Sequence, residues 1–190
     1  MKKLLVLLIV LFTLSSNVVL SADYNKGLTA YNNGDYVTAL REFKPLAEQG
    51  DSDSQYWMGY MYRKGLGVPQ DDKSAVKWLR LSAEQGDSGA QFNLGNMYQN
   101  GDHFKQDNIL AYMWLSISAS NGYDDKTDFA TKNMTSDELS IAQKLSQECL
   151  AMNNKCVKLA EKRKVEIAEA KRIAEEKRIA QEEFSDTIFE

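Results

Sequence analysis

The chain has 190 residues, of which 23 are Lys or Arg, 27 are Asp or Glu and one is His, so its formal net charge at pH 7 is −4. Residues 23–156 are mildly acidic, with 13 basic and 18 acidic side chains. This balance argues against a nucleic-acid partner, which would need a basic surface. One histidine and two cysteines are too few for a zinc site, so neither a metal nor any other cofactor is expected.

Residues 1–22 have the composition of a secretory signal peptide. Two lysines near the start precede an apolar run at 4–12, and small residues follow as far as Ala22. We therefore expect cleavage near Ala22 and a periplasmic or secreted mature protein. The alternative is an uncleaved membrane anchor, but the polar residues 15–17 interrupt a run that would need about 20 apolar residues to span.

The remaining chain repeats itself with a period of 36 residues. "AEQGDSDSQYWMGYMYRKG" at 47–65 returns in modified form as "AEQGDSGAQFNLGNMYQNG" at 83–101. Small and acidic residues keep this register through three units: Gly50, Gly86 and Gly122; Ala47, Ala83 and Ala119; Asp35, Asp71 and Asp107. A period of this length predicts an array of stacked supersecondary units.

Each unit has the pattern of two helices. Met58 and Tyr62 are four residues apart on one stripe, and Gly59 beside them allows a second helix to approach closely. Gly65 is expected to end this helix in a left-handed conformation, and Asp71 to cap the next one. The inner face of the second helix is predicted from spacings of three and four: Ala75, Trp78, Leu79 and either Ser82 or Ala83.

A single helical hairpin cannot bury its own apolar stripe, so neighbouring hairpins must stack. We predict an all-α fold, an α-solenoid of about three hairpins, over residues 23–130. The first hairpin is shortened, because "AYNNGDY" contains no counterpart of "LGVPQ".

Two further segments follow the predicted solenoid. Thr135 and Glu138 form a capping box for a helix in 131–156, which we expect to cover the end of the stack. Residues 157–190 are charged and rich in helix formers, which predicts a long helical tail. Its apolar residues do not keep a heptad pattern, so a monomer is favoured over an oligomer formed through the tail, and coiled-coil pairing remains the alternative.

The pattern A-Q-F/Y-x-L/M-G-x-M-Y-x-x-G, followed by "GLGVPQD" and A-E-Q-G-D, resembles the Sel-1-like repeat family, which is related to tetratricopeptide repeats. The resemblance covers about Tyr24 to Asp125. It departs at "GDHFKQD", where His103 and Lys105 replace Gly67 and Pro69. The resemblance implies a non-catalytic interaction scaffold of the bacterial cell envelope, with a protein or peptide as its partner.

In tetratricopeptide-like folds the first helix of each hairpin lines a concave surface, where we expect the partner to bind. The candidates lie opposite the apolar stripe of two first helices: Trp57, Tyr60, Lys64, Asn93, Asn96 and Asn100. We predict that Trp57 and Tyr60 anchor a partner segment while the asparagines bond its backbone. The alternative is that Trp57 and Tyr60 pack against the shortened first unit or the tail.

Cys149 and Cys156 are the two cysteines, and in an exported chain they would meet an oxidising environment. On one unbroken helix their Cα atoms would lie about 10.5 Å apart, beyond the roughly 7 Å limit for a bridge. A disulfide therefore requires a turn, which Asn153 or Asn154 could provide. We predict the bridge; the alternative is two separate thiols.

"SAVK" from Ser74 to Lys77 matches the S-x-x-K string of serine acyl-transfer enzymes, but the accompanying motifs are missing. Some cysteine-rich members of the resembled family are linked to β-lactam binding, and those carry a cysteine pair in each repeat, unlike this chain. We therefore predict no enzyme. The alternatives are a β-lactamase-like hydrolase, a penicillin-binding activity, or a structural assembly protein that uses its tail. His103 is expected to be a surface loop residue.

Overall fold

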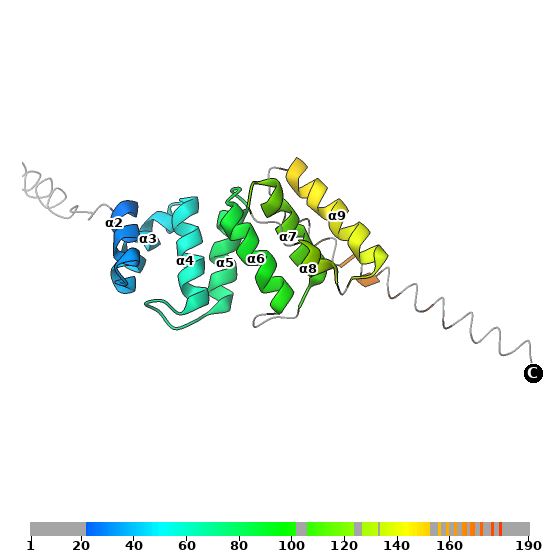
Figure 1. The fold of residues 1–190 in the computed structure, drawn as a ribbon, viewed down its shortest axis with the longest axis horizontal. Helices are drawn as coiled ribbons and strands as arrows, with labels where there is room; N and C mark the ends of the chain where they lie inside the picture. The colour runs from blue at the N-terminus through cyan, green and yellow to red at the C-terminus, as the bar shows by residue number, and fades with distance from the viewer. Residues whose placement is uncertain are drawn as a thin grey trace, which may run out of the picture.

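The structure is a computed structural model, and it describes residues 22–101, 106–123, 127–132, 134–152 and 156, with scattered positions between 159 and 179. Helices follow one another in chain order along the longest axis of the molecule, from α2 at one end to α9 at the other (Figure 1). The predicted signal peptide, apart from Ala22, and the loop residue His103 lie outside the described residues.

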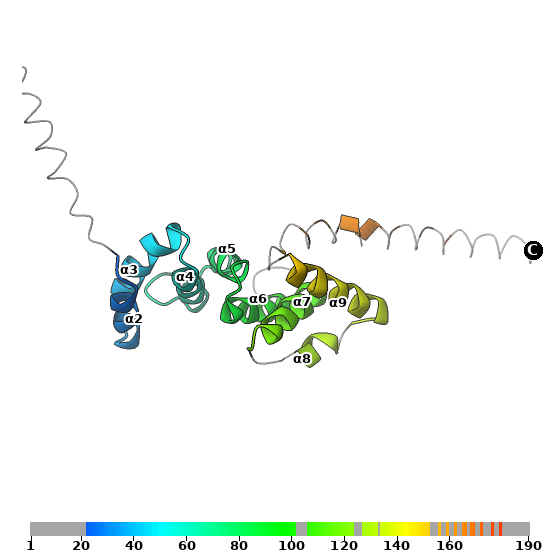
Figure 2. The ribbon, with the colours of Figure 1, turned by 90° about the horizontal axis from the view of Figure 1, so that it is seen from above.

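Three helical hairpins form most of the fold. Their helices are α2 (Tyr24–Asn32) and α3 (Tyr36–Glu48), α4 (Ser52–Lys64) and α5 (Asp72–Ala83), and α6 (Ser88–Asn100) and α7 (Asn108–Ser120). Each helix packs against the next one in the chain. The predicted all-α solenoid is therefore confirmed, with the hairpins side by side in both views (Figures 1 and 2).

Aspartates and glycines set the helix boundaries where the sequence predicts them. Asp71 begins α5, and its Oδ1 accepts a hydrogen bond from the amide N of Lys73 at 3.0 Å. Asp107 caps α7 in the same way. Gly65 and Gly101 end α4 and α6 with φ of 66° and 71°, a left-handed conformation that costs glycine little because it has no Cβ.

A glycine in each first helix allows the second helix of the same hairpin to approach closely. A Cβ added at Gly59 would lie 2.6 Å from Leu79 Cγ, which is closer than two carbon atoms can pack. The same contact recurs in all three hairpins, between Gly27 and Phe43, Gly59 and Leu79, and Gly95 and Leu115. The first pair is four residues closer in sequence than the other two, which confirms the shortened first hairpin.

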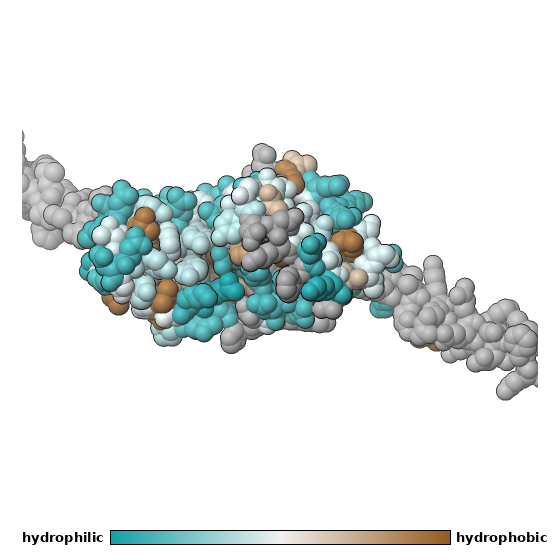
Figure 3. All heavy atoms as spheres, viewed as in Figure 1, coloured by the Kyte–Doolittle hydropathy of each residue, from teal (hydrophilic) through white to brown (hydrophobic). Residues whose placement is uncertain are grey.

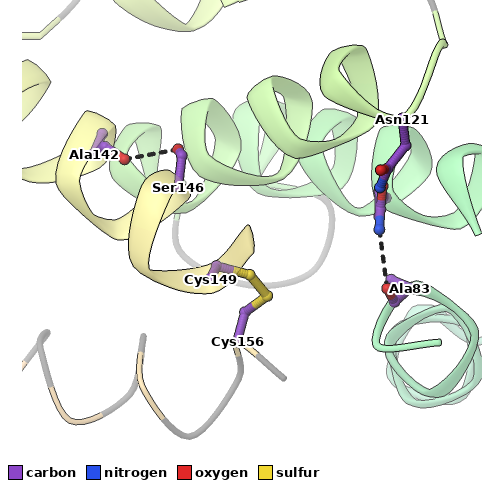
Figure 4. Close-up of a disulfide and its surroundings, with 7 residues drawn as sticks. Ala83, Asn121, Ala142, Ser146, Cys149 and Cys156 are labelled. Atoms are coloured by element: carbon purple, nitrogen blue, oxygen red, sulfur yellow. Dashed lines mark hydrogen bonds between the residues drawn. A yellow bond between two sulfur atoms is a disulfide. The ribbon is translucent and has the colours of Figure 1, made fainter. Parts of the chain in front are cut away.

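Buried glutamines connect successive hairpins. Gln91 is fully buried; its Nε2 donates to the carbonyl oxygen of Ala83 at 3.0 Å, and its Oε1 accepts from Asn121 Nδ2 at 2.9 Å. Gln55 makes the equivalent bond to Ala47 at 3.0 Å. Because a buried amide is costly unless it is hydrogen-bonded, these bonds favour one register between neighbouring units. Figure 4 labels the two partners of this connection, Ala83 at the end of α5 and Asn121 after the end of α7.

The two corresponding tryptophans differ in burial. Trp114 is 2% exposed in the core that extends from α5 to α9. Trp78, predicted to be equally internal, is only partly buried at the edge of the core around α2, α3 and α4. The prediction for Trp78 needs this correction. The physical reason is that α7 packs against α6 and also against α8 (Thr127–Thr131) and α9 (Ser136–Ala151), whereas α5 packs mainly against α4 and α6.

Helix α9 covers the C-terminal end of the stack. Thr135 and Glu138 form the predicted capping box at its start. Ala142, Leu145 and Cys149 are buried, and the helix packs against α7. The tail positions that the structure describes are helical. None of the described helices is both long and apolar enough to cross a membrane.

Candidate partner-binding face

The first helices carry an aromatic residue at the same position in each hairpin. Tyr24, Tyr56 and Phe92 are separated by 32 and 36 residues, which match the shortened first unit and the full repeat. All three side chains are partly buried, so part of each ring remains accessible. We call these residues the aromatic row; it crosses α2, α4 and α6.

Tyr24 and Tyr56 each meet a residue of the following unit, and Phe92 meets Tyr123 at the end of its own unit. Tyr24 Oη accepts a hydrogen bond from Trp57 Nε1 at 3.1 Å, Tyr56 Cε2 lies 3.1 Å from the place of a Cβ added at Gly89, and the rings of Phe92 and Tyr123 have centroids 4.8 Å apart. These contacts restrain the three rings of the row.

Trp57 lies against the first unit, in the arrangement that the sequence left open as the alternative. Its ring stacks on Phe43 with centroids 5.9 Å apart and planes 7° from parallel. It also contacts Tyr31 at 4.4 Å and bonds to Tyr24. Trp57 is partly buried. The Trp57 ring therefore contributes mainly to the packing between the first two hairpins.

Asn93 occupies the equivalent position in the next unit, and its side chain is likewise hydrogen-bonded within the protein. It is 7% exposed. Its Oδ1 accepts from Arg63 Nη1 at 2.7 Å, and its Nδ2 donates to the carbonyl oxygen of Gly89 at 2.8 Å. The expectation that this amide bonds a partner's backbone needs correction, because burial and these bonds commit it to the junction.

Tyr60 is partly exposed and joins the aromatic row to the first unit. Its ring lies 6.2 Å from Tyr56 and 6.4 Å from Tyr31, measured between centroids. Burial, and then the neighbouring Tyr60, raise the pKa of Tyr31 to about 12, so the Tyr31 phenol stays neutral over the physiological range. The structure thus brings Tyr60 together with Trp57, as predicted, although in a larger aromatic cluster.

The other three candidates lie further along the same helices. Asn96 is partly exposed, and Lys64 and Asn100 are exposed at the C-terminal ends of α4 and α6. All three lie on α4 or α6, the helices that also carry Tyr56 and Phe92.

Five aromatic residues of this face were missed in the sequence: Tyr24, Tyr31, Tyr56, Phe92 and Tyr123. A helical wheel compares residues within one helix, and these residues come together across units. The recurrence of an aromatic residue at 24, 56 and 92 was the available signal, once the first unit is aligned with its deletion.

Carboxylates lie beside two of the row's tyrosines. Asp51 and Asp87 cap α4 and α6 from equivalent positions, and Asp53 lies in the first turn of α4. Burial raises the pKa of the Asp87 carboxyl, and the nearby charge of Asp53 raises it further, while its hydrogen bond from the Ala90 amide opposes the shift.

The S-x-x-K string does not form a Ser-Lys pair. Ser74 Oγ donates to Asp71 Oδ2 at 2.6 Å, and Lys77 Nζ lies 5.6 Å from the centre of the Trp78 ring. The serine therefore reinforces the cap of α5. Among the residues that the structure describes, no group of three His, Cys, Asp or Glu side chains could hold a metal ion.

Cys149 and Cys156 are joined by a disulfide, with Cα atoms 4.9 Å apart (Figure 4). Both cysteines are fully buried in the core that includes Leu145, and Leu159 of the tail packs against the same core. The bridge therefore connects α9 to Cys156, directly before the tail.

Reduction of the disulfide is expected to lower the free energy of unfolding by about 2 kcal/mol, because it releases a short loop of the unfolded chain from its constraint. Urea unfolding followed by circular dichroism, with and without reductant, measures the loss. A Cys149→Ala/Cys156→Ala variant provides the control, since reductant should not change its curve. An identical curve for the reduced and oxidised protein would contradict the prediction.

Comparisons with known proteins agree with this geometry. The model of the Sel1 repeat family matches residues 52–87 and 88–123, each match beginning with a first helix. No curated protein matches the chain by sequence. A protective antigen present in uropathogenic Escherichia coli strains, which displays an SLR fold, is 27% identical with a TM-score of 0.59, over 66% of this chain and 28% of the antigen.

A Sel1 repeat protein from Oxalobacter formigenes is 31% identical with a TM-score of 0.51, over 53% of this chain and 42% of that protein. The chain thus spans less than half the length of either solved structure.

Proposed function

We propose that the chain, which contains two Sel1 repeats of a kind that generally mediate protein–protein interactions, is a non-catalytic scaffold that binds an extended segment of a partner protein across its first helices. The observation that carries the proposal is the aromatic row, which places partly accessible rings at equivalent positions of three successive hairpins.

The row suits such a partner for two physical reasons. Aromatic side chains bury much surface for little loss of rotamer freedom, and the contacts at the junctions already restrain these rings. A segment lying across α2, α4 and α6 would meet Tyr24, Tyr56 and Phe92 in turn, and Lys64 and Asn96 lie further along α4 and α6. The concave surface of a solenoid is the usual place for such binding.

We place the scaffold in the bacterial cell envelope or outside the cell. The composition of residues 1–22 supports export, as does the disulfide, since bridges persist in oxidising compartments such as the periplasm. Binding is favoured over acyl transfer because Ser74 is engaged with the capping residue Asp71, and Lys77 lies over the Trp78 ring instead of pairing with Ser74.

Photo-crosslinking in the native cell tests the function. A benzophenone side chain replaces Tyr60 or Tyr123, which lie on the aromatic face, and Lys77 on α5 serves as the exposed control. We expect one discrete crosslinked product from the two aromatic positions and none from Lys77. Equal labelling from all three positions, or labelling from Lys77 alone, would contradict binding at this face.

Trp57→Ala is unsuited to this test. The variant would lose the contacts of Trp57 with Phe43 and Tyr24, so reduced partner capture would reflect a loosened first hairpin. Tyr123 is 42% exposed and can be replaced with less disturbance.

A further inference from the structure

A buried carboxylate lies beside the residue at which the solenoid begins. Glu42, on α3, is 3% exposed. Its Oε2 accepts a hydrogen bond from the backbone N of Asp23 at 3.3 Å, and its Oε1 lies 2.7 Å from Lys26 Nζ. Because a buried charge is costly unless it is paired, these contacts explain how the carboxylate is tolerated here. Glu42 thus connects the start of α2 to α3.

The repeat shows that this carboxylate is specific to the first unit. Trp78 and Trp114 hold the position of Glu42 in the next two units, at the 36-residue period. Both tryptophans pack in apolar cores, Trp78 in the core of the preceding hairpin. In the first hairpin the side chain at this position meets the start of α2 instead of a preceding unit.

The outer side of α2 has the composition of a terminal helix. Its exposed residues are polar: Asn25, Lys26, Thr29 and Asn32. On the face drawn in Figure 3, hydrophilic residues predominate and apolar residues lie in separate spots. A polar outer face is what the end unit of a repeat protein needs for solubility. An end of this kind does not require an apolar segment before Asp23.

We propose that export removes residues 1–22, that the mature chain begins at Asp23, and that its new α-ammonium group forms an ion pair with Glu42. The proposal rests on the export proposed above and is independent of the partner-binding face. A signal-cleaving peptidase would hydrolyse the peptide bond between Ala22 and Asp23. Water adds across that bond, which leaves a carboxylate on Ala22 of the released peptide and, at neutral pH, an ammonium group on Asp23.

Cleavage changes the charge of the donor that Glu42 meets. In the precursor this donor is the neutral amide of Asp23, whereas in the mature chain the same nitrogen is positively charged. A charge-assisted hydrogen bond is roughly twice as strong as a neutral one. Lys26 Nζ lies against Oε1 of Glu42, so Oε2 is the oxygen that receives the ammonium group. Removal of residues 1–22 would therefore strengthen the link between α2 and α3.

Other charges nearby act on the same pair. Lys26 and the positive end of the α2 dipole repel the ammonium group, and Arg41 Nη2 lies 3.7 Å from Oε1 of Glu42. The carboxylate of Asp23, which caps α2, attracts it. The hydrogen bond from Lys26 holds the pKa of the Glu42 carboxyl below its usual value, against the effect of burial, so Glu42 is ionised at neutral pH.

The mass of the exported protein tests the cleavage. The full chain, with its own residues 1–22, is produced in a bacterial host and purified from the periplasm. We expect the intact mass of residues 23–190 with the disulfide closed. A chain that begins at Met1, at Ala22 or at any other residue would overturn the proposal.

Two mature chains with different N-termini test the ion pair. One begins at Asp23, and the other carries Gly-Ser-Gly-Ser before Ala22, which keeps the Asp23 amide but moves the ammonium group away. Urea unfolding at pH 7 and low ionic strength is expected to give a midpoint about 0.3 M higher for the chain that begins at Asp23. Equal midpoints would contradict the pair between the ammonium group and Glu42.

Side-chain variants made in both chains assign the difference to Glu42. Glu42→Gln keeps an acceptor oxygen and should abolish the difference in midpoint. Glu48→Gln, at an exposed position of the same helix, should leave it unchanged. Lys26→Gln removes the other close cation and should enlarge the difference even if Glu42→Gln fails to fold. A difference that Lys26→Gln leaves unchanged, or that survives in folded Glu42→Gln, would overturn the assignment.

The difference should also disappear in alkali. Pairing with Glu42 raises the pKa of the α-ammonium group above its ordinary value of about 7.7–8.0. The added stability is therefore fully present below about pH 7.5 and is lost as the pH rises through the higher folded-state pKa. Lysines and tyrosines titrate equally in both chains, so their effects cancel. Midpoints that still differ by the same amount at about pH 10 would show that the charge is not the cause.

The outcomes distinguish this proposal from the proposed function. Specific crosslinking from Tyr60 and Tyr123 by a protein that begins at another residue would overturn only the N-terminal ion pair. Recovery of the protein from the cytoplasm alone would overturn its export as well. Crosslinking that does not depend on position, in a protein that begins at Asp23, would overturn the binding face and support the ion pair.

Discussion

Replacing Trp114 by alanine is expected to lower the free energy of unfolding by about 3–5 kcal/mol, the range for removing a large buried aromatic side chain. Trp114 is 2% exposed, and its helix α7 packs against α6, α8 and α9. The cavity would therefore be enclosed on several sides and could collapse only in part. Urea unfolding followed by circular dichroism measures the loss without depending on tryptophan emission.

Trp78→Ala is the matched control, because Trp78 holds the same position one repeat earlier. It is only partly buried, so we expect a loss of about 1–2 kcal/mol. Equal losses in the two variants would contradict the difference in burial between the two repeats. In a repeat protein each unit contacts only its neighbours, so the Trp114→Ala variant should lose stability first near α7 and α9, which hydrogen exchange can locate.

Gly59→Ala is expected to destabilise the protein by about 3 kcal/mol, although alanine is the better helix former by roughly 1 kcal/mol. The added Cβ would meet Leu79 Cγ at 2.6 Å and the backbone N of the same residue at 2.9 Å. Because the second atom belongs to the backbone of α5, a rotamer change alone cannot relieve the overlap. The two helices of the hairpin would have to move apart, losing contacts along their length.

Gly89→Ala is the control for this prediction. Its added Cβ would meet the Tyr56 ring at 3.1 Å, and a ring can move by a few tenths of an ångström. We expect a change within about 1 kcal/mol, because improved helix propensity offsets the tighter contact. Thermal unfolding of both variants by circular dichroism checks the contrast, and a stable Gly59→Ala protein would show that the close approach of α4 and α5 is not required.

Much of the fold could be predicted because its signals are local in the sequence. Asp71 at the start of α5 and Gly65 at the end of α4 act within one helical turn, so their residue types are sufficient evidence. The capping box of Thr135 and Glu138 works at the same range. The 36-residue period then predicted that these hairpins recur and stack.

The candidate face was harder to predict, because the exposure of a side chain on one unit depends on the neighbouring unit that packs against it. Trp57 and Asn93 were placed on the free side of their helices, and each turned out to bond the preceding hairpin, Trp57 to Tyr24 and Asn93 to Arg63. Tyr60 lies where the helical wheel placed it. Tyr56 and Phe92 were passed over, although they repeat in register.

The sequence by itself determined the all-α class, the hairpin unit, its boundaries and the shortened first unit, because caps, glycines and apolar spacing act over a few residues or recur at a fixed period. Only the tertiary structure decided which side chains remain accessible, why Trp114 is buried more than Trp78, and that Asp87 lies beside Tyr56. The reason is that these contacts depend on how neighbouring hairpins are placed against each other. That placement results from packing between residues 30 or more positions apart in the sequence, such as Asn121 with Gln91.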